Sequence, residues 1–164
     1  DLELVGDGSH LTSFKMLGNF SFGNNDYNDS VNLWSEFLLD VGLSKNCIVH
    51  CHPSDFLEKE KLWTKHGFQV VSDEQCMWTD GNIGGTCCEI YYNGLEIGNL
   101  VNPQKHSTDV GFGFERLLMI LEGKNRIDET ELFDLSLQPI TRDVEFYLLN
   151  IIVNGHNGWK AKKL

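Results

Sequence analysis

Two strand-like segments meet at an Asn-Gly pair in the middle of the chain, and this feature restricts the fold most. Residues 88–92 and 96–102 are rich in apolar and β-branched side chains, and Asn93-Gly94 stands between them. An Asn-Gly pair favours the tight turn of a β-hairpin, because both residues tolerate positive φ. The sequence therefore predicts that these two segments pair as antiparallel strands.

Apolar periodicity predicts further elements on both sides of the hairpin. Helical spacing indicates helices from Asp29 to Gly42, from Asp55 to about His66 with Asp55 and Glu58 as a capping box, over 114–122, and over 144–153. Short strands are expected over 14–22, 47–51 and 68–71. Hairpins and helices without a regular βαβ alternation predict an α+β fold with an antiparallel sheet.

Length and composition are typical of one packed globular domain. The chain has 164 residues, of which 41% are hydrophobic and 23% charged. No apolar run approaches the roughly 18 residues of a membrane span, so we expect no membrane partner. The N-terminal residues carry no basic, apolar leader, which favours a cytoplasmic location and leaves a mitochondrial or other organellar one open. Because the chain begins at Asp1 without a Met, we expect it to be processed or cut from a longer protein.

The charge balance argues against a dedicated nucleic-acid-binding protein. Thirteen Lys and Arg against 24 Asp and Glu give a net charge of −11. Such a chain repels phosphate backbones unless its basic residues gather on one face. The tight basic cluster is the C-terminal tail with Lys160, Lys162 and Lys163, whereas the predicted final helix has no Lys or Arg. A small anionic ligand in one pocket remains compatible with this balance.

The five cysteines, Cys47, Cys51, Cys76, Cys87 and Cys88, form a poor framework for disulfides. An odd number with one adjacent pair favours a reducing compartment and buried structural thiols. The run from Cys47 to His52 holds four groups that can bind metals, but alternation along a strand sends neighbours to opposite faces. We therefore expect no zinc among the cofactors.

The segment from Asp109 to Arg116 holds the most informative group of residues. Gly111 and Gly113 would allow positive φ and a close approach of the backbone to a ligand. Arg116 follows one turn into a helix, where its guanidinium can cover a base or grip a phosphate. Asp109 can take the ammonium group of a ligand. Taken alone, however, this spacing favours an ordinary strand-to-helix turn with a surface arginine.

Three other segments add candidate binding residues. His10 and Phe14 place a polar group and an aromatic ring four residues apart, and the ring could stack on a purine. The Gly-rich stretch from Trp78 to Glu89 can bring backbone N–H groups to a ligand. Glu96 and Asn99 offer a carboxylate and an amide on one predicted strand.

Four segments of the chain resemble, in the same order, segments of the catalytic core of class II alanyl-tRNA synthetases. They are MLGNFSFG (16–23), WTDG–CCEIYY (78–92), EIGNLV (96–101) and DVGFGFERLL (109–118). The resemblance covers residues 1–135, and 136–164 would form a C-terminal helical extension of the same domain. It implies an antiparallel class II sheet flanked by helices. It also implies that His10-x-x-x-Phe14 is the second half of motif 2 and that the turn from Gly111 to Arg116 is motif 3.

The resemblance further implies ATP, Mg²⁺ and a small amino acid such as alanine as ligands. On the ATP side it places Phe14 on the adenine, His10 near the phosphates, and Arg116 with Gly111 and Gly113 at the nucleotide. On the amino-acid side it implies that Asp109 holds the amino group, Trp78 and Val101 line the pocket, and Asn99 lies near the substrate. Glu96 is a candidate ligand for Mg²⁺.

Departures from the family pattern leave three hypotheses open. Motif 1, the arginine-bearing first strand of motif 2, the Cys-Gly-Pro-Cys run and the editing domain are all missing. The chain is an ATP-dependent aminoacyl ligase core that is inactive in isolation, a noncatalytic module that binds a nucleotide or amino acid, or a ligase with an acceptor other than tRNA. We expect no tRNA binding by this chain alone. Homodimerisation and association with a larger synthetase chain both stay open.

Overall fold

The structure is a computed structural model that describes residues 2–23, 26–103 and 106–133. Its strands are β1 (Met16–Phe22), β2 (Cys47–Cys51), β3 (Gln69–Ser72), β4 (Met77–Thr79), β5 (Gly84–Tyr92), β6 (Leu95–Val101) and β7 (Ser107–Gly113). Its α-helices are α1 (Asp26–Asp40), α2 (Phe56–Lys65) and α3 (Phe114–Leu121). The chain divides into two compact units, one formed by 16–112 and the other by 1–15 together with 113–164.

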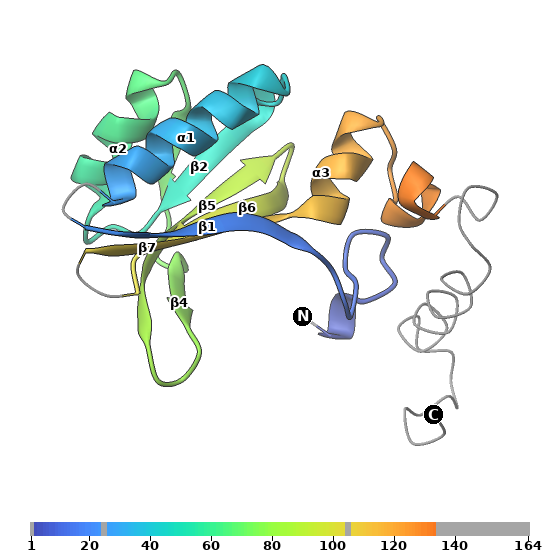
Figure 1. The fold of residues 1–164 in the computed structure, drawn as a ribbon, viewed down its shortest axis with the longest axis horizontal. Helices are drawn as coiled ribbons and strands as arrows, with labels where there is room; N and C mark the ends of the chain where they lie inside the picture. The colour runs from blue at the N-terminus through green and yellow to red at the C-terminus, as the bar shows by residue number, and fades with distance from the viewer. Residues whose placement is uncertain (1, 24–25, 104–105, 134–164) are drawn as a thin grey trace. The chain divides into compact units, whose positions relative to one another are not determined.

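The unit 16–112 is built on a mixed, mainly antiparallel sheet (Figure 1). Within the described residues the strand order is β1-β7-β6-β5-β2-β3, and β4 pairs with β5. The pairs β2/β5, β4/β5, β5/β6 and β6/β7 are antiparallel, which confirms the predicted α+β fold. One detail of the prediction is wrong: β2 and β3 are parallel and α2 connects them, so the chain does contain one βαβ unit.

The predicted hairpin is confirmed at the β5–β6 connection. Asn93 has φ 49° and Gly94 has φ 85°, the two positive values that the tight hairpin turn requires. The strands it joins pair from Tyr92 opposite Leu95 onward. A local sequence signal therefore fixes the register next to the turn, and an irregularity between Ile90 and Tyr91 shifts it by one residue further along the two strands.

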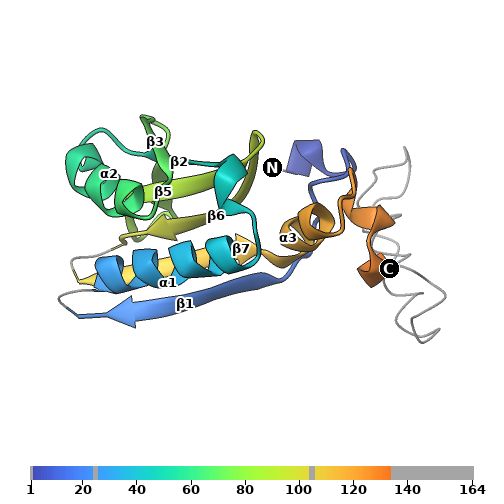
Figure 2. The ribbon, with the colours of Figure 1, turned by 90° about the horizontal axis from the view of Figure 1, so that it is seen from above.

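The helices α1 and α2 cover one face of this sheet (Figures 1 and 2). Trp34 of α1 stacks on Phe112 of β7, with ring centroids 4.4 Å apart. A Cβ at Gly98 of β6 would overlap the Phe112 ring, so this glycine makes room for the aromatic pair. On α2, Trp63 is fully buried against Phe68. The core of this unit therefore lies between the helices and the sheet.

The predicted capping box at the start of α2 is wrong. The helix begins at Phe56, but the Asp55 side chain makes no capping hydrogen bond with its N-terminus. Its Oδ2 atom accepts a hydrogen bond from the Thr86 hydroxyl at 2.6 Å and lies 2.9 Å from Nζ of Lys59. Because the Lys59 side chain is buried, it needs a counter-charge, and Asp55 supplies it.

The cysteines are arranged differently from the expected set of free thiols. Cys51 and Cys88 stand directly opposite each other on β2 and β5 and form a disulfide. The other three, Cys47, Cys76 and Cys87, are free and buried, as expected. Along β2, buried and half-buried residues alternate, so Cys47 and His50 point to opposite faces, as the argument against a zinc site in this run predicts.

The second unit is described over residues 2–15 and 113–133. Its helix α3 ends close to the predicted position, just before Gly123, which has φ 66°. The N–H of Ile127 donates to the carbonyl of Gly8 at 2.7 Å and ties the two segments together. The predicted helix 144–153, the extension 136–164 and the lysine tail lie outside the described residues. No described helix is long and apolar enough to span a membrane.

Candidate functional site

The predicted binding residues of the unit 16–112 share the face of the sheet that α1 and α2 do not cover. On β6 and β7, Val101 stands opposite Asp109 and Asn99 stands opposite Gly111. Directly opposite residues share a face, as do residues two apart on one strand. These four positions therefore point to the same side of the sheet.

Trp78 belongs to this face as well. It stands in β4 opposite Gly85, and Gly85 precedes Cys87 by two residues on β5. Cys87 is in turn the partner of Val101 on β6. Register alone thus aligns β4, β5, β6 and β7 into one surface that carries the predicted amino-acid-binding residues.

A pocket of about 370 Å³ opens on the unit 16–112. Its walls include Phe20 and Phe22 of β1, Trp78 and Ile83 of the β4–β5 hairpin, and Asp109 of β7. The structure therefore brings together two of the predicted amino-acid-binding residues, Trp78 and Asp109. Val101 is buried in a cluster against which Trp78 packs, and Asn99 is not part of the pocket wall.

Asp80 and Asp109 are the two carboxylates that line this pocket, and Asp80 is exposed, unlike Asp109. The side chain of Asp109 is half-buried, and burial raises the pKa of its carboxyl group above the ordinary value. The charged form of the carboxylate is disfavoured because burial removes part of its solvation by water. A cation in the pocket would offset that cost, so the position suits the ammonium group of a ligand.

The two glycines of the G-x-G segment do not adopt the expected positive φ. Strand β7 continues to Gly113, whose φ is −68°, and α3 begins at the next residue. At Gly111 a Cβ would overlap only the end of the exposed, flexible Met16 side chain. At Gly113 a Cβ would make only an ordinary contact of 3.6 Å with Arg116.

In the other unit, Arg116 lies in the first turn of α3 and is half-buried. Its Nε donates a hydrogen bond to the carbonyl of Ser9 at 3.0 Å. The arginine therefore connects α3 to the segment that carries His10 and Phe14, the other two predicted nucleotide-binding residues.

Phe14 is 56% exposed, so its side chain is accessible to a stacking partner. The residue after it is held firmly: the N–H of Lys15 donates to both carboxylate oxygens of Glu115, at 3.1 and 3.0 Å. Glu115 is only 5% exposed, and the N–H of Phe114 donates to the Lys15 carbonyl at 2.9 Å. The sequence analysis missed Glu115; its one signal was a charged residue inside an apolar helical stretch.

His10 is paired with Asp7 through its Nδ1 atom, 2.8 Å from Oδ2 of the carboxylate. Burial raises the pKa of Asp7, but hydrogen bonds from the Ser9 and His10 backbone and side chains outweigh it and bring the pKa down to about 2. Asp7 is therefore charged at neutral pH, and it orients the imidazole at the position expected near the phosphates.

With this geometry in place, comparison with known proteins decides the family. The model of the family "tRNA synthetases class II (A)" matches residues 1–136. The chain belongs to the class II (A) tRNA synthetase family. Among its relatives, the alanine–tRNA ligase of Wolinella succinogenes is 35% identical over 186 residues, which cover 88% of this chain and 21% of that protein. The alanine–tRNA ligase of Helicobacter hepaticus is 35% identical over 182 residues, covering 87% and 20%.

This class II synthetase domain thus spans about a fifth of the length of these relatives. Among solved structures, an apo histidyl-tRNA synthetase from S. aureus aligns over 90% of the chain and 52% of its own, with 15% identity and a TM-score of 0.47.

For this class II domain, the magnesium ligand proposed from sequence stays a prediction. Glu96 is half-buried near the beginning of β6 and is not part of the pocket wall. Among the described residues, the group of side chains whose ligand atoms converge closely enough for a metal does not include it.

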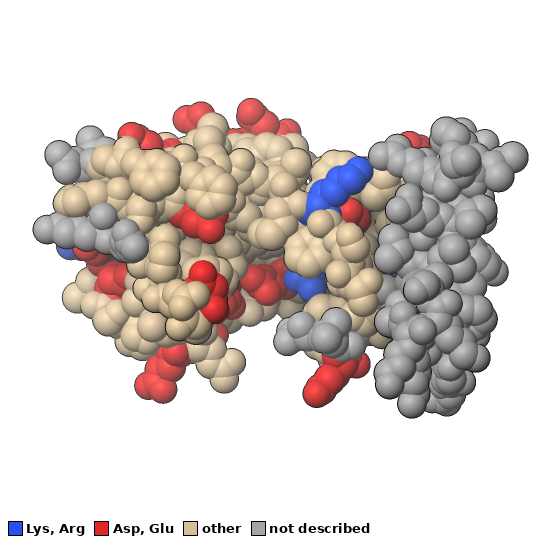
Figure 3. Space-filling model, turned by 60° about the horizontal axis from the view of Figure 1, so that its bottom comes forward, with Lys and Arg blue, Asp and Glu red and all other residues tan. Residues whose placement is uncertain are grey.

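The surface of the synthetase domain agrees with its negative charge. Figure 3 views the side away from α1 and α2, where acidic side chains of the described residues are scattered and few basic ones are visible. On this face, the described residues form no row of cations of the kind that neutralises a nucleic-acid backbone.

Proposed function

We propose that this domain binds ATP and a small α-amino acid such as alanine and activates the amino acid as an aminoacyl adenylate. The observation that carries the proposal is the pocket that holds both Trp78 and Asp109. A recognition site for an amino acid needs a carboxylate for the ammonium group and an apolar wall for the side chain, and this pocket offers both.

Selection of the amino acid falls to these two residues. Asp109 would pair with the α-ammonium group. This ion pair would offset the desolvation that disfavours the charged form of the buried carboxylate. Trp78 closes one side of the pocket and is itself backed by the buried Val101. A rigid aromatic wall of this kind limits the size of side chain that the pocket accepts.

Phe14 and Arg116 are the residues of the other unit that fit a nucleotide. The exposed side chain of Phe14 suits stacking on adenine, and the guanidinium of Arg116 suits a phosphate or the opposite face of the base. Glu115 supports this arrangement by fixing the backbone next to Phe14. When bound, Mg²⁺ would neutralise charge on the triphosphate.

The reaction requires positioning rather than covalent chemistry by side chains. A carboxylate oxygen of the amino acid attacks the α-phosphorus of ATP and forms a new P–O bond. The bond from that phosphorus to the bridging oxygen of the β-phosphate breaks, and pyrophosphate leaves with the electron pair. In this reaction Asp109 would hold the ammonium group of the amino acid, and Phe14 would hold the adenine of ATP.

The acceptor of the activated amino acid is a further part of the proposal. The relatives are named as tRNA ligases, but this chain spans about a fifth of their length. With a net charge of −11, tRNA binding would depend on parts beyond this chain. A non-tRNA acceptor is the alternative for the same adenylate.

One observation favours a second candidate function, a module that binds ligand without catalysis. At the position expected near the phosphates, His10 is already paired with the charged Asp7. The negative charge of this carboxylate opposes binding of a triphosphate nearby. A noncatalytic sensor or partner of a full synthetase would tolerate that arrangement.

Two measurements test the proposal. Calorimetry with non-hydrolysable adenylate analogues should show tight binding of the alanyl analogue and weaker binding of the leucyl analogue. Absence of binding, or equal binding of the two, would contradict the proposed pocket. Alanine-dependent exchange between ATP and pyrophosphate, measured in a longer protein that carries this domain, then separates the candidates, because a noncatalytic module would bind the analogue without catalysing exchange.

A further inference from the structure

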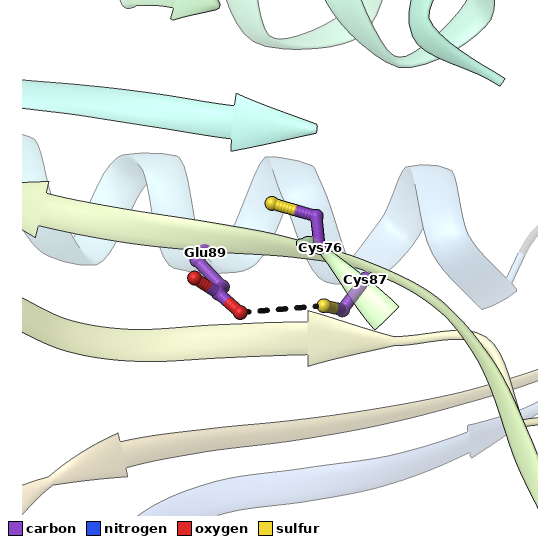
Figure 4. Close-up of side chains that lie close together, drawn as sticks. All are labelled: Cys76, Cys87 and Glu89. Carbon is purple, nitrogen blue, oxygen red and sulfur yellow. Dashed lines mark hydrogen bonds between the residues drawn. The ribbon is translucent and has the colours of Figure 1, made fainter. Parts of the chain in front are cut away.

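Three side chains that bind metals converge at the base of the β4–β5 hairpin (Figure 4). The N–H of Cys87 donates to the carbonyl of Cys76 at 2.9 Å, so these cysteines continue the pairing of β4 with β5 and share a face. Glu89 lies two residues further along β5 and points to the same side. The two sulfur atoms and a carboxylate oxygen all lie within 4.8 Å of one another.

The surroundings of this group are closed and ordered. Cys76 is 0% and Cys87 1% exposed, and Val101 and Trp78 pack against them. The Tyr91 hydroxyl donates to one oxygen of Glu89 at 2.8 Å, while the other oxygen lies 3.7 Å from Sγ of Cys87. The carboxylate is therefore oriented by one partner and directed at the thiols by its second oxygen.

We propose that Cys76, Cys87 and Glu89 form a structural zinc site. Ligands at about 2.3 Å for sulfur and 2.0–2.2 Å for oxygen around a tetrahedral ion lie roughly 3.5–3.8 Å apart, a spacing that this group can adopt with small rotations of its side chains. Two thiolates select a soft ion such as Zn²⁺ over Mg²⁺. The site is therefore distinct in chemistry from the one that would hold the Mg²⁺ of ATP.

Charge and proton balance favour binding of a divalent cation. Binding releases two thiol protons, and two thiolates, one carboxylate and Zn²⁺ leave the site with one net negative charge. The described residues supply three ligands, and one bound water would complete the tetrahedron.

A metal at this position would brace the wall of the candidate pocket. It would join the last residue before β4 to two residues of β5, directly behind Trp78. The inference is independent of the proposed function, since a structural metal can be present whether or not the domain activates an amino acid. It also differs from the zinc site that the sequence analysis considered and did not expect between Cys47 and His52, because Cys76 and Cys87 come together only through strand pairing.

Metal titration of the full chain after chelation tests the site. We expect one Zn²⁺ per chain, with X-ray absorption showing two sulfur ligands at about 2.3 Å and lighter ligands at about 2.0–2.2 Å. Cys76→Ser and Cys87→Ser should lose the metal, and Glu89→Gln should weaken its binding. Cys47→Ser is the matched control, a buried free cysteine outside the group that should bind zinc as the wild type does.

Two further outcomes keep the test decisive. The double variant Cys51→Ser/Cys88→Ser should retain zinc, because these sulfurs belong to the opposite face of β5. Co²⁺ added to the wild type should give thiolate-to-metal absorption, which tests the site even if the cysteine variants fail to fold. Absence of stoichiometric zinc in the wild type, its retention in folded Cys76→Ser, or a Cys76–Cys87 disulfide in the zinc-treated protein would overturn the proposal.

Discussion

Glu115 and Lys15 are 100 residues apart in sequence, yet both carboxylate oxygens of Glu115 accept the backbone N–H of Lys15. This contact ties the N-terminal segment to the start of α3 within one unit. It also fixes the main chain beside Phe14, so a residue that need not touch any ligand holds the expected stacking ring in place.

Glu115→Ala should destabilise the protein by about 1–3 kcal/mol, because it leaves a part-buried N–H without its acceptor. Glu115→Gln keeps one acceptor oxygen and should cost less. Urea denaturation measures both. Glu36→Gln, at an exposed position of α1, is the control and should stay within about 0.5 kcal/mol of the wild type. A loss no larger than that control would show that the contact contributes nothing to stability.

Arg116→Ala should weaken ATP binding by about 1–3 kcal/mol, the range for a charge-assisted contact. Arg116→Lys should restore little of this affinity, since an ammonium group lacks the planar guanidinium that stacks and binds in two places. Calorimetric titration gives the affinities. Arg126→Ala is the matched control, because that guanidinium already pairs with Asp128 on the surface. Equal ATP affinity in wild type and Arg116→Ala would remove the assignment.

Asp7 should make the stability of its unit sensitive to acid. Its folded-state pKa is about 2, below the ordinary 3.8, so its contribution is complete above pH 3.8 and is lost as the pH falls toward 2. Asp7→Asn should lower stability at pH 5 and flatten the pH dependence between 4 and 2. Thermal unfolding across that range measures the effect, with the exposed Asp29→Asn as control. Parallel curves for Asp7→Asn and wild type would contradict the assigned pKa.

The chain alone should not bind tRNA at physiological salt. Its net charge is −11, and phosphate binding needs several cations on one face. A gel-shift assay with total tRNA at about 150 mM salt tests this, because the Debye length there is only about 8 Å. Saturable micromolar binding that survives deletion of residues 159–164 would refute the charge argument.

Local signals in the sequence were sufficient for much of the fold. Asn93-Gly94 predicted the central hairpin because turn geometry depends on those two residues alone. The strand 47–51 and the helix that ends before Gly123 followed from apolar runs and a stop residue. The positive φ expected at Gly111 and Gly113 is wrong, since strand β7 runs through both glycines.

Contacts between residues far apart in the sequence could not be predicted from local sequence signals. The disulfide from Cys51 to Cys88 depends on β2 lying beside β5, which no local pattern announces. The Glu115–Lys15 contact and the Cys76–Cys87–Glu89 group likewise require the tertiary register. The residues that line the pocket were predicted from the sequence only in part. Trp78 and Asp109 both line it, whereas Val101 lies behind its wall.

The central claim is that Asp109 recognises the α-ammonium group of the amino acid, and the variant Asp109→Asn tests it. The stability of this variant shows whether a loss of ligand binding comes from unfolding. Because burial raises the pKa of Asp109, its charged form costs stability above pH 3.8, and that cost is relieved as the pH falls below the folded pKa. The amide removes the charge, so the variant should be at least as stable as the wild type at pH 7. Any loss of ligand binding in Asp109→Asn therefore cannot be attributed to unfolding.

The most direct test compares two ligands on these two proteins by calorimetry. One is the non-hydrolysable alanyl-adenylate analogue, and the other is its propionyl counterpart, which lacks only the α-ammonium group. We predict that the wild type prefers the alanyl analogue by about 1.5–3 kcal/mol, the value of a hydrogen bond to a charged group. In Asp109→Asn this preference should disappear. An equal preference in both proteins would contradict the role of Asp109 in selecting an amino acid.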